Sequence, residues 1–177
     1  MTDYSTCTIT QYPTPVLMDR AKPVAEINDE IRVLAERMID IMVETKGVGL
    51  AGPQAGVNLR LFVVSIDGTK ENAKCYINPT IKVEGSVVAS EEGCLSLPGI
   101  YGKIKRFSKC TVTATGLDGN EFTEVGEGLL GRALQHEHDH LEGRMIKDRL
   151  GYAAKLRSKK PLEELEAEYE KTQSENK

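Results

Sequence analysis

The chain has 177 residues, of which 40% are hydrophobic and 28% are charged, with a formal net charge of −4. This size and composition are typical of one globular domain with a substantial hydrophobic core, and we expect a single domain over residues 1–177. The mild charge without a basic stripe argues against nucleic-acid binding, and apolar runs such as 61–64 are too short to cross a membrane.

The N-terminus and the cysteines bear on the cellular compartment. Residues 1–10 are polar and lack a basic segment followed by an apolar stretch, so we expect no signal peptide and a cytoplasmic protein. The cysteines form no C-x-x-C pair, which argues against a disulfide framework. They are Cys7, Cys75, Cys94 and Cys110.

The first third of the chain predicts an extended segment, a helix and a strand. Three prolines favour loop structure over residues 1–25. Hydrophobic residues recur at helical spacing over 26–45, with Asn28 as a candidate cap and a stop at Lys46-Gly47. A glycine-rich loop over 47–56 then precedes a strand over 59–66.

The next third predicts more strands and a second helix. Alternating and β-branched residues indicate strands, which a glycine or a turn sequence separates. The strands are expected over 75–83, 87–90, 107–116 and 121–125, with a hairpin turn around 117–120. A helix is expected to begin at Gly126 or Glu127, run to about Glu142 and end at Gly143.

The C-terminal stretch, residues 153–177, is very polar and predicts a peripheral helix from Pro161 that frays beyond Lys171, or a tail.

Taken together, the elements predict an α+β fold. In it, antiparallel or mixed β-sheets pack around a central helix that carries the histidines, with an N-terminal and a C-terminal helix.

All three histidines lie within the run His136-Glu137-His138-Asp139-His140, which contains an H-E-x-x-H pattern. Residues four apart share one face of a helix, so His136 and His140 can bind one metal ion. Glu137 is then beside that ion, where it can exchange a proton with water. A chance match on a surface helix is the alternative. Hydrophobic neighbours indicate a buried helix instead, which favours a metal because buried charges need partners.

Two histidines leave a catalytic metal short of one protein ligand. No histidine follows His140, Glu142 is too close to reach around the ion, and later glutamates lie in the polar tail. The search therefore turns upstream to Glu92-Gly93-Cys94-Leu95-Ser96, next to a Pro98-Gly99 turn. A Cys94 thiolate would complete a Cys-His-His set, although a lone cysteine is more often a structural thiol.

The glycine-rich segment 47–54 reads Gly-Val-Gly-Leu-Ala-Gly-Pro-Gln. It does not fit a phosphate-binding loop, because no Lys-Ser/Thr follows the glycines and no strand leads into them. A flexible turn is one interpretation. The other is a rigid edge whose backbone N–H and C=O groups stay open to a ligand.

Three segments together resemble the motifs of the peptide deformylases, in that family's order and at similar separations. They are 47–54, 92–96 and 135–140, the last reading Q-H-E-x-D-H. Weaker similarity extends from about Pro13 to Leu150. The resemblance implies a single catalytic domain over 1–177. Its activity would be removal of the formyl group from the N-terminal methionine of newly made polypeptides, with release of formate.

The resemblance also implies roles for individual residues. Cys94, His136 and His140 would hold one divalent ion per chain, usually Fe²⁺ in the cell, with Zn²⁺, Ni²⁺ or Co²⁺ able to substitute. Glu137 would take a proton from water and deliver it to the departing amine. The Gln54 side chain and the Leu95 N–H would stabilise the developing oxyanion, each worth about 3–4 kcal/mol.

The substrate in this interpretation is an extended N-formylmethionyl nascent peptide. Its backbone would pair with Val48, Gly49 and Gly93 by strand addition, which suits substrates that share only their first residue. Ala133 would help line an apolar pocket for the methionine. The resemblance leaves room for a transient contact with the ribosome, and we expect neither direct nucleic-acid binding nor a membrane.

Neighbouring residues carry further expectations. Glu92 and Asp139 either orient a metal-binding imidazole or form a plain ion pair, with Arg106 as the cationic partner. His138 lies about 200° around the helix from the two ligands and should face away from the metal. The family usually has alanine where this chain has Gly52, so we expect a less rigid loop around Gln54 rather than lost activity.

Two rival functions stay open on the sequence alone. A metallopeptidase that cleaves internal peptide bonds shares H-E-x-x-H but needs a third ligand after the helix. A domain in which metal only holds the fold would need no Glu137. The sequence is silent on the native metal, the oligomeric state and any preference beyond the first residue.

Overall fold

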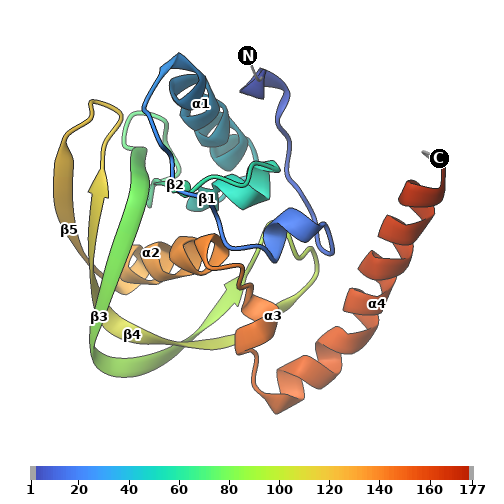
Figure 1. Cartoon of the computed structure of the whole chain (residues 1–177). Coiled ribbons are helices and arrows are strands. Elements are labelled where there is room, and N and C mark those ends of the chain that lie inside the picture. Colours follow the sequence, from blue (N-terminus) through green and yellow to red (C-terminus); the bar gives the residue numbers. More distant parts are fainter. Residues whose placement is uncertain (1–2, 176–177) are drawn as a thin grey trace.

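The structure is a computed structural model that describes residues 3–175 and has a mixed α+β fold (Figure 1). The helices are α1 (Asp29–Glu44), α2 (Gly128–Leu141), α3 (Ile146–Arg149) and α4 (Tyr152–Glu175). The strands are β1 (Gly49–Ala51), β2 (Leu61–Val64), β3 (Lys74–Gly93), β4 (Tyr101–Thr115) and β5 (Glu121–Glu127). Short 3₁₀ helices lie at Tyr4–Thr6, Pro15–Leu17 and Gly52–Ala55. Residues 1–2 and 176–177 of the predicted domain lie outside the described part.

The strands form a five-stranded sheet in the order β1-β2-β3-β4-β5, with every neighbouring pair antiparallel. Within residues 3–175, the only parallel pairing is the isolated bridge between Lys22 and Leu59. The predicted α+β class is confirmed, in its antiparallel rather than its mixed form. Strand β1 is an edge strand, so one side of it stays open for pairing.

Strand β2 lies between two helices because its side chains are hydrophobic on both faces. Leu61 and Val63 belong to the core cluster of α1, whereas Phe62 and Val64 belong to the cluster of α2. Figure 1 shows α2 with β1 and β2 on one side and the long strands β3 and β4 curving around the other. This arrangement makes α2 the central helix of the domain.

Helix α1 has the ends that its sequence predicts. Asn28 Oδ1 accepts a hydrogen bond of 3.1 Å from the Ile31 N–H, which confirms the predicted cap. At the other end the Gly47 N–H donates to the Met42 carbonyl, and Lys46 has a φ of 56°. The chain leaves α1 at Lys46-Gly47, as expected, and leads directly into β1.

Strand β3 corrects the prediction of two separate strands over 75–83 and 87–90. Its register against β4 shifts between Glu84 and Val87, where β3 contains one residue more than its partner. Gly85 has a φ of 86° and absorbs this extra residue as a β-bulge. Pairing then continues to Gly93, so the strand delivers residues 91–93 to the site. The sequence pattern shows the glycine but not the partner strand that keeps both halves in one ladder.

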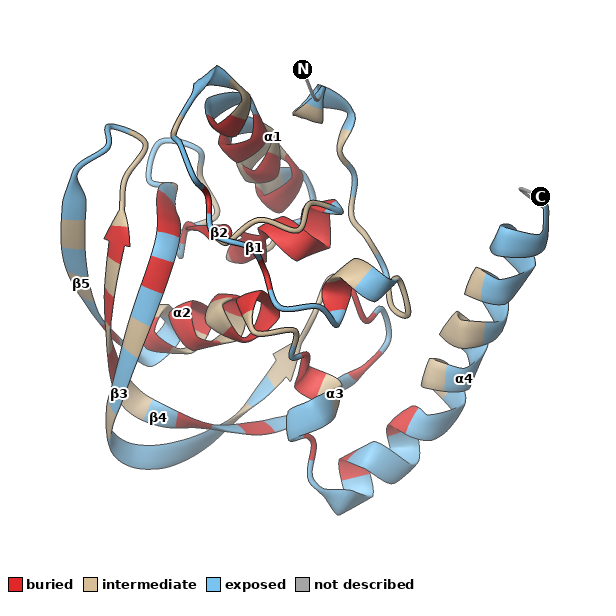
Figure 2. Ribbon diagram, viewed as in Figure 1, coloured by how far each residue is buried: buried red, intermediate tan, exposed pale blue. Residues whose placement is uncertain are grey.

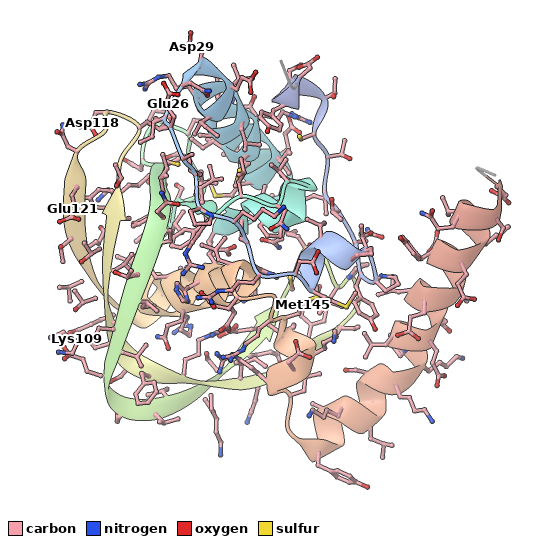
Figure 3. The ribbon with its side chains drawn as sticks, in the orientation of Figure 1. Glu26, Asp29, Lys109, Asp118, Glu121 and Met145 are labelled. Atoms are coloured by element: carbon pink, nitrogen blue, oxygen red, sulfur yellow. The ribbon has the colours of Figure 1, made fainter. Side chains whose placement is uncertain are left out.

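The hairpin between β4 and β5 confirms the predicted turn around residues 117–120. The Gly119 N–H donates to the Gly116 carbonyl at 3.0 Å. Asp118 and Glu121 lie at the outer end of this hairpin, away from α2 (Figure 3). Strand β4 begins at Tyr101, earlier than predicted, because it pairs with the second half of β3.

The segment 47–56 is more ordered than the predicted loop, because β1 and a 3₁₀ helix occupy most of it. Strand β1 pairs with β2, and this pairing depends on residues about 13 positions away, which local composition does not show. Helix α2 begins at Gly128 and is followed by Gly143 with a φ of 68°, close to the predicted ends.

Helix α4 begins at Tyr152 rather than at Pro161 and runs on to Glu175, so both predicted limits are wrong. Ala154, Leu162 and Leu165 recur at helical spacing and pack on a core cluster, which offsets the hydrogen bond that Pro161 cannot make. Figure 2 shows α4 mostly exposed. None of the helices within residues 3–175 combines the length and hydrophobicity that a membrane span needs.

Candidate active site

Helix α2 places two imidazoles side by side. His136 and His140 are four residues apart, so they project from one face of the helix. Their Nε2 atoms lie 3.2 Å from each other. His140 is 1% exposed, while His136 lines an open cavity. One imidazole is therefore reachable by solvent and the other lies beneath it.

Cys94 comes from the other side of the cavity, in the turn that follows β3. Its carbonyl accepts a hydrogen bond from the Leu97 N–H at 2.9 Å, which closes this turn. The sulfur lies 3.3 Å from His140 Nε2. The three possible ligand atoms of Cys94, His136 and His140 all lie within 4.8 Å of one another. The structure thus brings together the three residues predicted as metal ligands.

The chemistry of this group fits a divalent transition metal. A thiolate and two imidazoles are ligands that Fe²⁺ and Zn²⁺ both accept, and three protein ligands leave a coordination position for water or substrate. Glu92 Oε2 lies 3.0 Å from His136 Nδ1, which turns the Nε2 of that ring toward the other two atoms. His140 Nδ1 is buried and makes no hydrogen bond to the described residues.

Glu137 follows the first histidine and lines the same cavity. The residue is 3% exposed, and its Oε2 makes no hydrogen bond within residues 3–175. Burial raises the pKa of Glu137 to about 7, although the neighbouring His136 and Arg106 act in the opposite direction. A buried carboxylate with one oxygen left free is suited to exchange protons with a small molecule in the cavity.

The pKa values of the two histidines shift in opposite directions for physical reasons. Burial lowers the pKa of His140 well below its usual value, and the adjacent His136 lowers it further. Burial also lowers the pKa of His136. However, its hydrogen bonds with Cys94 and Glu92 raise this pKa to about 10. The carboxylate of Glu92 therefore holds a proton on Nδ1 of His136.

The 3₁₀ helix Gly52–Ala55 positions Gln54. Its Oε1 accepts a hydrogen bond of 2.9 Å from the Ala51 N–H, and its Nε2 lies 3.5 Å from the Cys94 sulfur. Gln54 is 1% exposed, so its amide is held rigidly and faces the cavity. Leu95 follows Cys94 and lines the same cavity, and its N–H makes no backbone hydrogen bond in the described part of the chain. Both groups can donate to an oxygen in the cavity.

Gly52 has a role that differs from the expected loosening of this loop. A Cβ at this position would lie 2.5 Å from the Leu59 carbonyl oxygen and 3.1 Å from that of Val57. The absence of a side chain therefore lets two backbone segments approach closely, and the Val57 N–H donates to the Gly52 carbonyl at 3.0 Å. The loop is tightly packed in this chain, and the lower rigidity expected from Gly52 stays a prediction.

We predict that Gly52→Ala destabilises the protein by about 2 kcal/mol, since the added methyl group must displace backbone. Chemical denaturation monitored by circular dichroism measures this difference. Gly151→Ala is the matched control, because a Cβ there would meet nothing within 4 Å. Equal stability of the Gly52→Ala variant and the unmodified protein would contradict the prediction.

The cavity has a volume of about 500 Å³ and is open to solvent. Nine of the ten predicted site residues line it, and the tenth, His140, lies buried beneath. The nine are Val48, Gly49, Gln54, Gly93, Cys94, Leu95, Ala133, His136 and Glu137. Further residues line it, of which Glu92 was predicted as a possible partner of a metal-binding imidazole, and Gly47, Pro98 and Gly99 were named in the neighbouring segments. The further residues are Lys46, Gly47, Glu91, Glu92, Pro98, Gly99, Tyr101, Leu129 and Arg132.

A buried chain of ion pairs supports the metal-binding face of α2. Arg106 donates to Glu92 at 2.7 and 2.9 Å and to Asp139 at 2.9 Å. Arg149 donates to both oxygens of Asp139, at 2.6 Å to Oδ2 and at 2.5 Å to Oδ1. Glu92 both orients His136 and pairs with Arg106, whereas Asp139 only pairs with arginines. Arg149 was not predicted, because no local pattern distinguishes it from neighbouring charged residues.

His138 lies on the opposite side of α2, as expected from its place on the helix. Its Nε2 is 3.2 Å from Arg60 Nη2 and 3.9 Å from Glu142 Oε1. Burial lowers its pKa, and the positive charge of Arg60 lowers it further. His138 therefore takes no part in the Cys94, His136 and His140 group.

Comparisons with known proteins agree with this geometry. The family model described as polypeptide deformylase matches residues 6–155. Peptide deformylase 1 of Clostridium perfringens is 46% identical over 134 residues, which cover 75% of this chain and 90% of that protein. Peptide deformylase of Rhodopirellula baltica is 35% identical over 167 residues, covering 93% and 83% respectively.

Solved structures agree as well. A peptide deformylase from Plasmodium falciparum superposes with a TM-score of 0.89 at 33% identity, covering 93% of this chain and 98% of that chain. A peptide deformylase from Legionella pneumophila gives a TM-score of 0.84 at 37% identity, covering 95% and 97%.

Proposed function

The chain belongs to the peptide deformylase family, and from this premise we propose how its residues carry out the reaction. It is a metal-dependent hydrolase that removes the formyl group from N-formylmethionyl peptides. One observation carries the proposal. The possible ligand atoms of Cys94, His136 and His140 lie close together, and Glu137, which has a carboxylate oxygen without a hydrogen bond, lines the same cavity.

We propose that Cys94, His136 and His140 hold the metal ion. When bound there, a divalent ion supplies Lewis-acid polarisation of the formyl oxygen and makes water easier to deprotonate. Fe²⁺ is the proposed ion in the cell, with Zn²⁺, Ni²⁺ or Co²⁺ as substitutes. Metal analysis of protein purified without oxygen tests this assignment, and zinc at full occupancy with no iron would overturn it.

Glu137 is the proposed general base and acid. Its pKa near 7 lets it accept a proton from the water whose oxygen bonds to the formyl carbon, and later return that proton to the amine nitrogen as the C–N bond breaks. Gln54 Nε2 and the Leu95 N–H then donate to the formyl oxygen as negative charge develops there. Hydrolysis consumes one water and releases formate and a peptide with a free N-terminus.

The substrate peptide is proposed to bind as an additional strand beside β1. Strand β1 has an open edge next to Val48 and Gly49, and Gly93 lies at the end of β3 on the facing wall. Backbone hydrogen bonds on both sides would hold an extended chain without regard to its side chains. Ala133 and Val48 offer apolar surface for the methionine.

Assay of the purified protein on formyl-Met-Ala-Ser tests the function. We expect release of formate from this peptide and no cleavage of its N-acetylated or unformylated counterparts. Cleavage inside the unformylated peptide would instead support the metallopeptidase alternative. No release of formate from the metal-loaded protein would overturn the proposal.

Newly made polypeptides are the proposed substrates, so the cytoplasm is the proposed compartment and a transient ribosome contact is proposed as well. Exposed basic residues on the first half of α4, among them Lys155, Arg157 and Lys159, support such a contact. Co-sedimentation with ribosomes at low salt tests it. Equal sedimentation with and without ribosomes would overturn the proposed contact and leave the hydrolase function untouched.

A further inference from the structure

Lys46 occupies a backbone position that usually belongs to glycine. It follows the C-terminus of α1 and has a φ of 56°, which costs a residue with a Cβ more than it costs glycine. A lysine here also interacts favourably with the C-terminus of α1. However, a lysine at a neighbouring position would make the same interaction without the cost of a positive φ. Lys46 is exposed and lines the active-site cavity, so its flexible cationic side chain can reach a ligand there.

Arg132 is the second cation of the cavity. It lies on α2, four residues before His136, so both residues are on the same face of the helix. Within residues 3–175, neither Lys46 nor Arg132 has a carboxylate within 4.0 Å. The rim residue Glu91 is opposite Lys103 in the strand register and also forms no ion pair within 4.0 Å among the described residues. Two cations and one carboxylate without ion-pair partners therefore line the rim of the cavity, and their sum is positive.

The direction of the bound peptide follows from the burial of the edge strand. Gly49 lies against the Glu137 carboxylate, and a side chain on Gly49 would occupy the space that this carboxylate fills. The reacting formyl group therefore belongs next to Gly49 and Glu137. Beyond Gly49, Ala51 and Gln54 are buried, whereas Lys46 at the opposite end is exposed. The peptide therefore leaves the site along Val48 and Gly47 toward Lys46.

The spacing of an extended peptide identifies which residue meets these cations. Lys46 is three residues from Gly49, at most about 10 Å along the chain, and an extended substrate advances about 3.3 Å per residue. Side chains of the first and third residues point to the same face, while the second points away. If the methionine side chain points into the cavity, the side chain of the third substrate residue points to the same face. It then lies near Lys46 and Arg132.

We propose that Lys46 and Arg132 make this enzyme favour formylated peptides with aspartate or glutamate at the third position. The proposal rests on the deformylase function above and names a preference within its substrate class. Both cations are partly solvated, so the effect is a graded selectivity that salt weakens, rather than an absolute requirement.

Competing amidated peptides test the proposal with the metal-loaded enzyme. We expect kcat/KM for formyl-Met-Ala-Glu-amide to exceed that for formyl-Met-Ala-Lys-amide by about fivefold at low ionic strength. Amidation removes the terminal carboxylate, which would otherwise add a negative charge to both peptides. The ratio should approach one in about 1 M salt, where the Debye length falls to about 3 Å.

Variants separate an effect of these cations from other causes. Lys46→Gln and Lys46→Gly should both reduce the ratio, as should Arg132→Gln, and the double variant Lys46→Gln with Arg132→Gln should bring it to about one. Lys82→Gln is the matched control. It removes an exposed lysine of β3 that does not line the cavity, and should leave the ratio unchanged.

The outcomes distinguish this proposal from the function on which it rests. A ratio near one in the unmodified enzyme, with both peptides hydrolysed, overturns the selectivity and leaves the deformylase function standing. A Lys46→Gly variant that is more stable but keeps the full ratio shows that Lys46 serves only the end of α1, which also overturns it. Failure to hydrolyse either peptide counts against the function itself.

Discussion

The Glu137→Gln variant is expected to lose about a thousandfold in kcat on formyl-Met-Ala-Ser while it retains its metal. Glutamine preserves the size of the side chain but cannot accept a proton from water at neutral pH. The metal-binding atoms belong to Cys94, His136 and His140, so the substitution removes none of them. Formate release measures the rate, and elemental analysis measures the metal content.

Glu121→Gln is the matched control for this experiment. Glu121 lies at the outer end of the β4–β5 hairpin, far from the cavity, and its substitution changes the net charge by the same amount (Figure 3). We expect the control to have the turnover of the unmodified protein. A Glu137→Gln variant with more than a tenth of that turnover would exclude Glu137 as the general base.

The Arg106→Met variant is expected to lower the free energy of unfolding by about 3–5 kcal/mol. Arg106 is 4% exposed and bridges the carboxylates of Glu92 and Asp139, so its loss leaves two buried negative charges with fewer partners. The variant should also bind metal about tenfold more weakly, because Glu92 would no longer hold His136 in one orientation. Urea denaturation and metal titration measure the two effects.

Arg149→Met provides the comparison within the same chain of ion pairs. Its side chain is 35% exposed, and Asp139 keeps Arg106 as a partner when it is removed. We expect a smaller loss of stability and unchanged metal affinity. Equal effects of the two substitutions would indicate that the buried chain acts as one structural unit, and that Arg106 has no particular connection to His136.

The elements that depend on neighbouring residues were predicted well from the sequence. Asn28 caps α1 because its side chain bonds to the backbone three residues later, and Gly143 follows α2 because it adopts a positive φ. Elements that depend on distant partners were predicted poorly. β1 is ordered by its pairing with β2, and β3 stays continuous through Gly85 because β4 pairs with both halves.

The site shows the same division. The spacing of His136 and His140 on one helix and the identity of Glu137 are local properties, so the sequence by itself determined the kind of chemistry. Cys94 was inferred from the lack of a later ligand and from family resemblance, since nothing local shows that the end of β3 reaches α2. The partnership of Arg149 with Asp139 and the close backbone contact at Gly52 had no local signal at all.

The sequence alone therefore determined helices α1 and α2, the class of fold and the reactive side chains, because these depend on periodicity and on residue type. Only the tertiary structure decided which side chains meet in the cavity, which charges lack partners there, and which end of the edge strand is open. These properties arise from contacts between segments that are far apart in the chain. The free energies of these contacts depend on burial, and a residue becomes buried only when several segments pack together.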